Sequence, residues 1–259
     1  MRVLICEDGA AAAQRTADIL CASVANRPDA VLGLATGGTM EPVYAVLRNR
    51  IAAGSLDLSG VTTFNLDEYV GLAVTHPQSY RATMQRLLFD AAGLPPARCH
   101  LPDGSAADPV AEARAYEAAI EAAGGIDLQL LGIGHNGHIG FNEPTSSLGS
   151  RTRVKTLTGE TRRANARFFG PDEEAPQFAI TMGIKTVLET RACVLLATGP
   201  RKAAVVAAAI EGPLAAACPA SALQLHPQAT FVLDPAAAAG LKLRDYYETV
   251  HPGGGEARL

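Results

Sequence analysis

The side chains best suited to acid–base chemistry follow directly after one apolar run. The segment from Leu130 to Pro144 reads LLGIGHNGHIGFNEP, and it supplies two imidazoles, two amides and one carboxylate: His135, His138, Asn136, Asn142 and Glu143. Histidine exchanges protons near neutral pH, and a neighbouring carboxylate can orient its ring. The glycines between these residues let the backbone turn sharply and approach a ligand closely. The segment therefore predicts proton-transfer chemistry at the end of a strand.

Two other interpretations of the histidines remain open. A single histidine in a loop can be held by ordinary hydrogen bonds alone. The i, i+3 spacing of His135 and His138 also allows a zinc site, although the sequence supplies no clear third and fourth ligand.

A second carboxylate site follows the run VTTFNL, where Asp67 and Glu68 come next. A carboxylate at the end of a strand beside an apolar wall can act as a proton-abstracting base. The alternative is that Asp67 caps a turn, because aspartate is favoured there for local hydrogen-bonding reasons.

Two further strand ends could bind an anion. The run VLGLA is followed by TGGT at residues 36–39, whose amide N–H groups and following helix could hold a phosphate. Lys202 lies in the first turn of another predicted helix, where a cation is unfavourable unless an anion lies nearby. The alternatives are a tight turn at TGGT and a solvated lysine. The nucleotide motifs GxxxxGK[ST] and GxGxxG are absent.

The elements that must position these loops follow an alternating pattern. The apolar runs RVLIC, AVLGLAT, GVTTFNL, IDLQLLGIG, ACVLLAT and ATFVLD predict buried strands, and stretches with helical spacing lie at 10–25, 41–53, 79–93 and 109–125. Fully apolar strands that alternate with helices predict a three-layer αβα sandwich with a mainly parallel sheet. Ligands of such sheets bind at the carboxyl ends of the strands, where these loops converge.

We expect one catalytic domain over residues 1–250. Residues 158–178 show little apolar periodicity and are expected to form a mobile lid, whose Arg162, Arg163 and Arg167 could close over the same anion. The glycine-rich tail at 251–259 is expected to be flexible.

Composition narrows the class of protein. The 259 residues are 48% hydrophobic, enough for a substantial core. The net charge of −4 and the scattered basic residues argue against nucleic-acid binding. Five cysteines without CxxC spacing predict reduced thiols in a cytoplasm. The N-terminal apolar run is too short for a secretory signal, and no run approaches the roughly 18 apolar residues of a membrane span.

Taken together, the loops resemble those of glucosamine-6-phosphate deaminases, in the glucosamine/galactosamine-6-phosphate isomerase family. The matching segments lie between about Val31 and Asp234: LGLATGGT, FNLDEYVGL with HPQSYRATM, GIGHNGHIGFNEPTSSLGSRTRVKTLT, TRRANARFF and LQLHPQA. The resemblance implies a Rossmann-like, sugar-phosphate isomerase fold. It also implies conversion of glucosamine 6-phosphate to fructose 6-phosphate and ammonia without a cofactor or metal.

The resemblance assigns roles to individual residues. Asp67 would remove the C2 proton of the opened sugar and return it at C1. His138 would move the proton that opens the ring, with Glu143 orienting it. The 6-phosphate would be held by Thr36, Gly37, Gly38, Thr39, Arg167 and Lys202. An aldose–ketose isomerisation needs such a base, an acid–base group near the ring oxygen and a remote anchor.

Asn136 stands where some members of the family carry aspartate, whereas other members resemble this chain in having asparagine. Asparagine cannot stabilise an imidazolium by charge, but it can hydrogen-bond the histidine or a sugar hydroxyl. We therefore expect His138 to depend more strongly on Glu143.

The resemblance also implies allosteric activation in a homo-oligomer, since the family is often hexameric and sometimes monomeric. Members activated by N-acetylglucosamine 6-phosphate bind it between subunits, through residues that match Ser146, Arg153, Lys155 and Thr156 and through a tyrosine near the C-terminus. Tyr246 or Tyr247 could supply that tyrosine here. The alternative is that SRTRVKTLT is only a polar surface strand.

Two competing functions are a 6-phosphogluconolactonase-like hydrolase and a non-catalytic sugar-phosphate-sensing module. The segments FNEP and LDEYVGL favour the deaminase over the lactonase. A sensor needs an anion site but no base, and such modules come with a DNA-binding helical segment, whereas this chain begins at its first strand. The presence of both Asp67 and His138 therefore favours catalysis.

Overall fold

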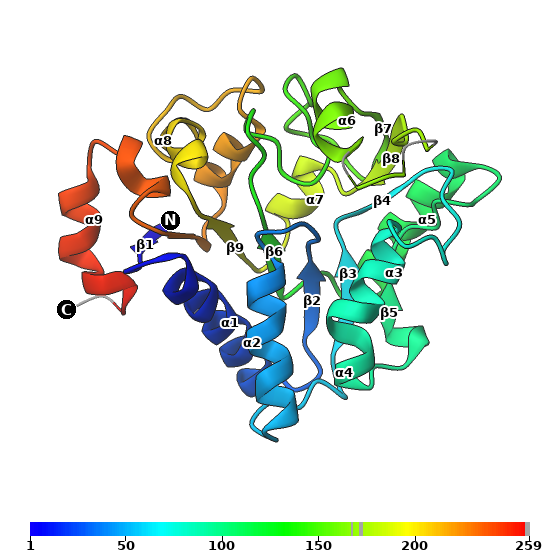
Figure 1. Cartoon of the computed structure of the whole chain (residues 1–259), viewed down its shortest axis with the longest axis horizontal. Helices are drawn as coiled ribbons and strands as arrows, with labels where there is room; N and C mark the ends of the chain where they lie inside the picture. Colours follow the sequence, from blue (N-terminus) through cyan, green and yellow to red (C-terminus); the bar gives the residue numbers. More distant parts are fainter. Residues whose placement is uncertain (167, 171–172, 257–259) are drawn as a thin grey trace.

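A computed structural model gives the structure of residues 1–166, 168–170 and 173–256. Within these residues the chain forms a larger parallel sheet, a smaller antiparallel sheet and surrounding helices (Figure 1). The α/β sandwich with a mainly parallel sheet, predicted from the alternating pattern, is confirmed.

The larger sheet has seven strands in the described residues, and every pairing between them is parallel. In spatial order they are β1 (Arg2–Ile5), β10 (Ala229–Leu233), β9 (Ala192–Ala197), β6 (Leu128–Leu131), β2 (Val31–Leu34), β3 (Thr62–Asn65) and β5 (Cys99–His100). All but β5 lie within the apolar runs that predicted strands. Chain order reverses between β2 and β6, so the loops after these two strands border a crevice at the carboxyl edge.

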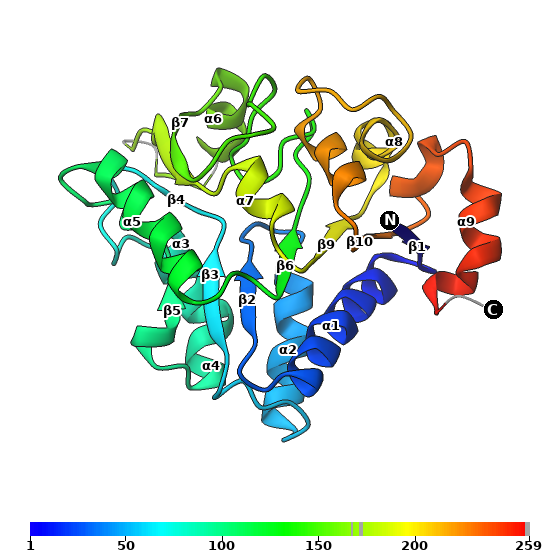
Figure 2. The same ribbon diagram turned by 180° about the vertical axis from the view of Figure 1, so that it is seen from behind.

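Helices cover both faces of this sheet (Figures 1 and 2). On one face, Leu20 of α1 (Gly9–Asn26) and Leu47 of α2 (Glu41–Ala52) pack near Leu34 of β2. On the other face, Tyr116 of α5 (Pro109–Ala122) makes an edge contact with Phe64 of β3 at a centroid distance of 5.7 Å. Strands buried on both sides favour apolar residues at successive positions, which explains the apolar runs in the sequence.

The remaining helices are short. The stretch predicted as one helix at 79–93 forms α3 (Tyr80–Met84), a π-helical turn (Gln85–Phe89) and α4 (Asp90–Ala92). The others are α6 (Gly159–Ala166), α7 (Ile184–Leu188), α8 (Ala203–Ile210) and α9 (Arg244–Val250). Short 3₁₀ turns occur at Pro96–Arg98, Pro200–Lys202, Pro219–Leu225, Ala237–Gly240 and Pro252–Gly254.

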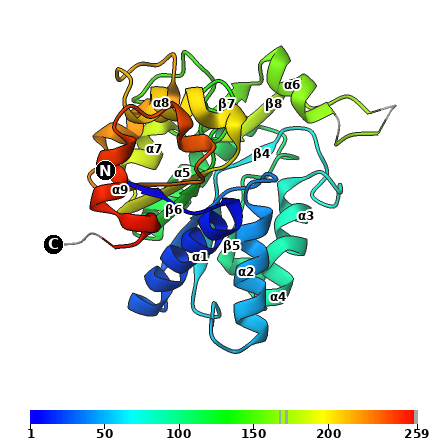
Figure 3. The ribbon, with the colours of Figure 1, turned by 60° about the vertical axis from the view of Figure 1, so that its left-hand side comes forward.

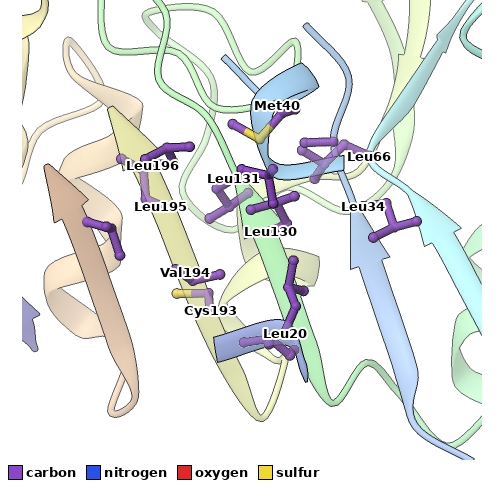
Figure 4. Packing of buried hydrophobic residues seen from close by; sticks show 14 of the residues in the cluster. Leu20, Leu34, Met40, Leu66, Leu130, Leu131, Cys193, Val194, Leu195 and Leu196 are labelled. Carbon is purple, nitrogen blue, oxygen red and sulfur yellow. The ribbon is translucent and has the colours of Figure 1, made fainter. Parts of the chain in front are cut away.

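The core is continuous across the centre of the larger sheet. Leu130 and Leu131 of β6 are fully buried between β9 and β2, and Met40 and Leu66 close the core toward the carboxyl edge (Figure 4). Burying aliphatic side chains stabilises the fold by about 1.5–3 kcal/mol each. The loops at the carboxyl edge therefore stand on rigid strands.

The smaller sheet was not predicted. It contains, in spatial order, β4 (Asp67–Tyr69), β8 (Phe178–Thr181) and β7 (Arg153–Thr156), paired antiparallel beside α6 (Figures 1 and 3). Leu66 joins the two sheets, because its N–H donates to Leu34 O at 2.9 Å and its carbonyl accepts from Met182 N–H at 2.7 Å. One residue thus links β2 of the larger sheet to the strand that begins with Asp67.

Residues 251–256, which follow the expected end of the domain, pack against the rest of the protein. His251 and Gly254 are buried, and Glu256 pairs with Arg15 and Arg2 near β1. The packed chain therefore extends past the predicted boundary at residue 250 as far as residue 256, because these residues cover the edge of β1. Across the described ranges, no helix is both long and apolar enough to cross a bilayer.

Candidate active site

A cavity of about 260 Å³ opens at the carboxyl edge of the larger sheet, beside the reversal between β2 and β6. Its lining comes from all four predicted loops, from the start of α3 and from α6. The lining residues are Ala35, Thr36, Gly37, Thr39, Met40, Leu66, Asp67, Tyr80, Gly132, Ile133, Gly134, His135, His138, Gly140, Phe141, Thr161, Asn165 and Lys202. Asp67 and His138 therefore face one hollow, which the TGGT loop and Lys202 also line.

Asp67 does not cap a turn. It is the first residue of β4, pairs with Thr181 of β8, and is only 6% exposed. Burial and the neighbouring Glu68 carboxylate raise the pKa of Asp67 to about 8, although hydrogen bonds from Thr181 and the Phe141 N–H oppose the rise. A carboxylate that is this basic is suited to accept a proton from carbon.

Glu68 anchors the helix that borders the cavity. Its buried carboxylate accepts the backbone N–H groups of Tyr69, Tyr80 and Arg81, each at 2.9 Å. Burial raises the pKa of Glu68, while these three backbone hydrogen bonds oppose the rise. Two adjacent carboxyl groups thus have different tasks, because Glu68 holds the start of α3 whereas Asp67 faces the cavity.

Gly140 permits the chain to pass over Asp67. Its φ is +56°, and a β-carbon there would lie 2.9 Å from Thr181 Oγ1 and 3.1 Å from Asp67 Oδ2. Any other residue would be strained in this backbone conformation and would crowd the carboxylate.

His138 lies against Glu143, as predicted from the sequence. Nδ1 of the histidine is 3.6 Å from Oε2 of the glutamate, an ion-pair distance that is long for a hydrogen bond. The side chain of Glu143 is only 2% exposed, whereas that of His138 is 18% exposed. Gly134 lies under the imidazole, where a β-carbon would come within 2.2 Å of the ring.

Asn136 joins both partners of this pair. Its Nδ2 donates to Glu143 Oε2 at 2.9 Å, and its Oδ1 accepts the His138 backbone N–H at 3.2 Å. Asparagine therefore contributes to the glutamate an N–H that an ionised aspartate could not provide.

Glu143 is strongly favoured in its ionised form. Burial alone would raise its pKa, but the interaction with His138 and hydrogen bonds from Thr161 and Asn136 outweigh that effect and lower the pKa to about 2. Thr158 Oγ1 also lies 3.2 Å from Glu143 Oε1. The carboxylate thus stays negative beside the imidazole throughout the neutral pH range.

Most of the predicted phosphate ligands line the cavity. Thr36, Gly37 and Thr39 line it, and Gly38 lies between them in the chain. Lys202 ends the 3₁₀ turn before α8 and its Nζ donates to Ile133 O. Burial and the nearby Arg201 lower the pKa of Lys202. The predicted ligand Arg167 lies outside the described residues.

The other lid arginines do not contribute to this wall in the described part of the chain. Arg162 and Arg163 border a separate surface hollow with Glu173 and Glu174. His135 lines the cavity and pairs with Glu160 of α6, Nε2 to Oε1, at 2.8 Å. Among the described residues no group of three potential metal ligands gathers around the two histidines.

Several lining residues were missed because they do not themselves carry a titratable group near neutrality. Tyr80 and Phe141 stack at 6.0 Å, and Asn165 Nδ2 donates to the Tyr69 hydroxyl at 2.8 Å. Tyr80 follows the helix-capping Ser79, and Asn165 lies four residues after Thr161 on one face of α6. In the sequence, the position of Tyr80 and Asn165 after polar loops is the feature that could have indicated a place in the site.

The residues proposed for an effector site are divided between two ends of the molecule. Arg153, Lys155 and Thr156 form β7, whereas Tyr246 and Tyr247 lie on α9 at the opposite end (Figures 1 and 2). Ser146 Oγ and Arg153 Nη2 are buried without a hydrogen-bond partner in the described residues. Burial lowers the pKa of Arg153.

Comparisons with known proteins agree with this arrangement. Residues 8–232 match a family described as glucosamine-6-phosphate isomerases/6-phosphogluconolactonase. The glucosamine-6-phosphate deaminase of Hahella chejuensis is 55% identical over 250 residues, which cover 96% of this chain and 95% of the relative. A solved structure of a monomeric glucosamine-6-phosphate deaminase is 44% identical, with a TM-score of 0.90 and coverage of 93% of this chain and 100% of that one. The 6-phosphogluconolactonase of Trypanosoma brucei shares the fold alone, at 17% identity, a TM-score of 0.74 and coverage of 93% and 98%.

Proposed function

The chain belongs to the family of glucosamine-6-phosphate isomerases and 6-phosphogluconolactonases, and within this family we infer that it is a glucosamine-6-phosphate deaminase. It converts glucosamine 6-phosphate and water to fructose 6-phosphate and ammonia. The observation that carries this inference is the shared cavity of Asp67 and His138, in a chain 55% identical to a deaminase. The lactonase alternative shares the fold at much lower identity.

His138 serves ring opening in this proposal. With Nδ1 turned toward Glu143, Nε2 is left to exchange a proton with the ring oxygen and the anomeric hydroxyl. When the imidazole of His138 holds this proton it is an imidazolium, and the ionised Glu143 stabilises that positive charge. Asn136 supports the same charge through its hydrogen bond to Glu143.

Asp67 serves the isomerisation. It takes the proton from C2 of the open-chain aldose, the electron pair forms the C1–C2 double bond, and the C1 carbonyl oxygen takes up a proton from the substrate ammonium group to give a neutral enol-amine. Return of the proton to C1 leaves a C2 iminium, which water converts to the ketose and ammonia. In the free enzyme Asp67, with a pKa of about 8, is mainly protonated at pH 7, but the substrate ammonium group would lower that value on binding.

The basic end of the cavity anchors the 6-phosphate. Thr36, Gly37, Gly38 and Thr39 are proposed to supply hydroxyl and amide donors, while Lys202, and Arg167 from the lid segment, are proposed to supply positive charge. Lys202 Nζ donates to the Ile133 carbonyl in the free protein and would turn to the phosphate. Binding energy gained at this remote group orients C1 and C2 over Asp67.

Measured ammonia release tests the function directly. Purified protein should release ammonia and form fructose 6-phosphate from glucosamine 6-phosphate, and should leave 6-phosphogluconolactone unhydrolysed above the background rate. Lactone hydrolysis without ammonia release would instead identify the lactonase. Binding of the phosphosugar without either reaction would identify the sensing module.

We further propose an effector site for N-acetylglucosamine 6-phosphate at Ser146, Arg153, Lys155 and Thr156. The unpartnered Ser146 Oγ and Arg153 Nη2 support it, since buried polar groups without partners are costly and a ligand bound there would supply partners. The tyrosines of α9 lie too far away in the same chain, so this proposal requires a homo-oligomer such as a hexamer. Hyperbolic saturation that is indifferent to the effector would contradict it.

The remaining expectations are proposals of the same kind. Residues 158–178 are proposed to act as a lid, since α6 lines the cavity through Thr161 and Asn165. A role in N-acetylglucosamine degradation in the cytoplasm follows from the proposed substrate, and the free thiols of all five cysteines support that compartment.

A further inference from the structure

The helix α6 begins directly against Glu143. Thr158 precedes it and accepts the Thr161 backbone N–H through Oγ1 at 3.2 Å, as a capping residue does. The Thr161 hydroxyl donates to Glu143 Oε1, and Thr158 Oγ1 lies 3.2 Å from the same oxygen. The first turn of this helix is therefore bonded to the carboxylate that faces His138.

The two oxygens of Glu143 have separate partners. Oε1 contacts only the threonines of the α6 turn among the hydrogen bonds described, whereas Oε2 accepts from Asn136 and faces His138 Nδ1. A carboxylate is planar, so fixing Oε1 fixes the direction in which Oε2 points. Thr161 is 4% exposed and Glu143 is 1% exposed, so water has little access to replace the hydroxyl.

Two further contacts join α6 to the same region. Glu160 pairs with His135 at 2.8 Å, and Asn165 donates to the Tyr69 hydroxyl at 2.8 Å. The N-terminal end of a helix also carries partial positive charge, which favours an ionised carboxylate beside it. Neither of these contacts reaches Glu143, so within α6 the hydroxyl of Thr161 makes the direct link to the acid–base pair, next to the capping Thr158.

We propose that Thr161 is a positioning residue for deamination, acting through Glu143 Oε1 so that Oε2 faces His138. The proposal rests on the deaminase function inferred above. It adds that the hydroxyl of a residue in the expected lid sets the geometry of the ring-opening pair. Thr161 itself needs no contact with a reacting atom for this role.

The test removes the hydroxyl while keeping the shape of the side chain. Thr161→Val should lower kcat about tenfold or more, because hydrogen bonds to charged groups contribute about 1.5–3 kcal/mol. KM should change by less than about threefold, because the phosphate anchor is untouched. Thr161→Ser keeps the hydroxyl and should retain most of the activity. As a matched control, Thr16→Val removes another buried threonine hydroxyl, bonded only within α1, and should leave kcat unchanged.

A double-mutant cycle separates positioning from general support of the fold. In the Glu143→Gln background, Thr161→Val should reduce kcat by less than about twofold further, since the group through which it acts is already altered. Additive losses would overturn the proposal, and so would wild-type activity in Thr161→Val. If Thr161→Val fails to fold, Thr161→Ala provides the same cycle.

Different results would overturn the deaminase function and the role of Thr161. If the wild-type protein releases no ammonia from glucosamine 6-phosphate, the deaminase function itself is overturned. If the wild type is active but Thr161→Val, folded as judged by its circular dichroism spectrum, matches it in kcat and KM, only the role of Thr161 is overturned.

Discussion

At the scale of residues, the site depends on two carboxylates whose surroundings move their pKa values in opposite directions. Burial and Glu68 raise the pKa of Asp67 to about 8, whereas His138, Thr161 and Asn136 lower that of Glu143 to about 2 despite its burial. Groups separated in this way can take different parts in proton transfer. Asp67 is able to accept a proton, while Glu143 remains a fixed negative charge.

Asp67→Asn should leave substrate binding nearly intact and lower turnover at least about a hundredfold, because the amide cannot accept the C2 proton. Steady-state kinetics with glucosamine 6-phosphate, together with calorimetric binding of the substrate, would measure both effects. A loss of affinity with little loss of rate would contradict the assignment of Asp67 as the base.

The raised pKa of Asp67 also predicts that the stability of the protein depends on pH. The folded state holds the proton up to a pKa of about 8, whereas the unfolded chain releases it near its usual value of 3.8. Its contribution to the free energy of unfolding is therefore fully present below about pH 4 and is lost as pH rises toward 8. The stability of Asp67→Asn relative to wild type should rise across this window, by at most about 1.4 kcal/mol per pH unit.

Urea unfolding of wild type and Asp67→Asn at a series of pH values between 5 and 9 would measure this difference. Comparing the two proteins cancels the titration of groups that the substitution leaves alone. A difference that stays constant with pH would mean that the pKa of Asp67 is not raised in the folded protein.

Lys202→Ala should weaken binding of the phosphorylated substrate far more than it slows chemistry, because Lys202 lies at the basic end of the cavity. Inorganic phosphate as a competitive inhibitor offers a simple probe, and its inhibition constant should rise in the variant. Lys185→Ala is a matched control, since it removes a surface lysine that pairs with Glu189 and does not line the cavity. Equal phosphate inhibition of wild type and Lys202→Ala would argue against the anchor.

At the scale of elements, the parallel strands could be predicted from the sequence and the antiparallel ones could not. Strands β2, β6 and β9 are apolar apart from Gln129 of β6, because helices cover both of their faces. By contrast, β7 reads RVKT and is largely half-exposed, and β4 contains only the residues DEY. Short polar strands carry too little periodicity to be distinguished from loops.

The same difference explains what could be predicted of the site. Asp67 and His138, which line the cavity, and Glu143 beside His138 could be singled out because strand ends mark the ligand-binding edge, and that edge is set by the larger sheet. Thr161 and Asn165 could not be found in this way, since they reach the cavity from α6 through a tertiary contact. The pairing of Asp67 with Thr181 likewise depends on the smaller sheet.

The contacts of α6 predict how the expected lid responds to ligand. Amide hydrogen exchange over residues 159–166 should slow on addition of inorganic phosphate or a substrate analogue, because closing the helix protects its hydrogen bonds. Exchange in the core strand β6 should not change, and it supplies the internal control. Equal exchange of α6 with and without ligand would contradict the lid.

At the scale of the whole molecule, the cavity lies between two sheets that meet at Leu66. The proposed phosphate ligands Thr36, Thr39 and Lys202 follow β2 and β9 of the larger sheet, whereas Asp67 begins β4 of the smaller one. Leu66 bonds to Leu34 on one side and Met182 on the other. The separation between anchor and base is therefore set by one rigid junction.

Such a junction makes the protein sensitive to the number of carbons in its substrate. In a 2-amino-2-deoxypentose 5-phosphate, C2 lies one carbon nearer the phosphate than in the hexose. If the phosphate is held at the same place, C2 no longer reaches Asp67. We expect this shorter homologue to bind competitively but to release ammonia at least about a hundredfold more slowly than the hexose. Discrimination between homologous sugars would thus originate in the backbone of Leu66, a residue that carries no functional group.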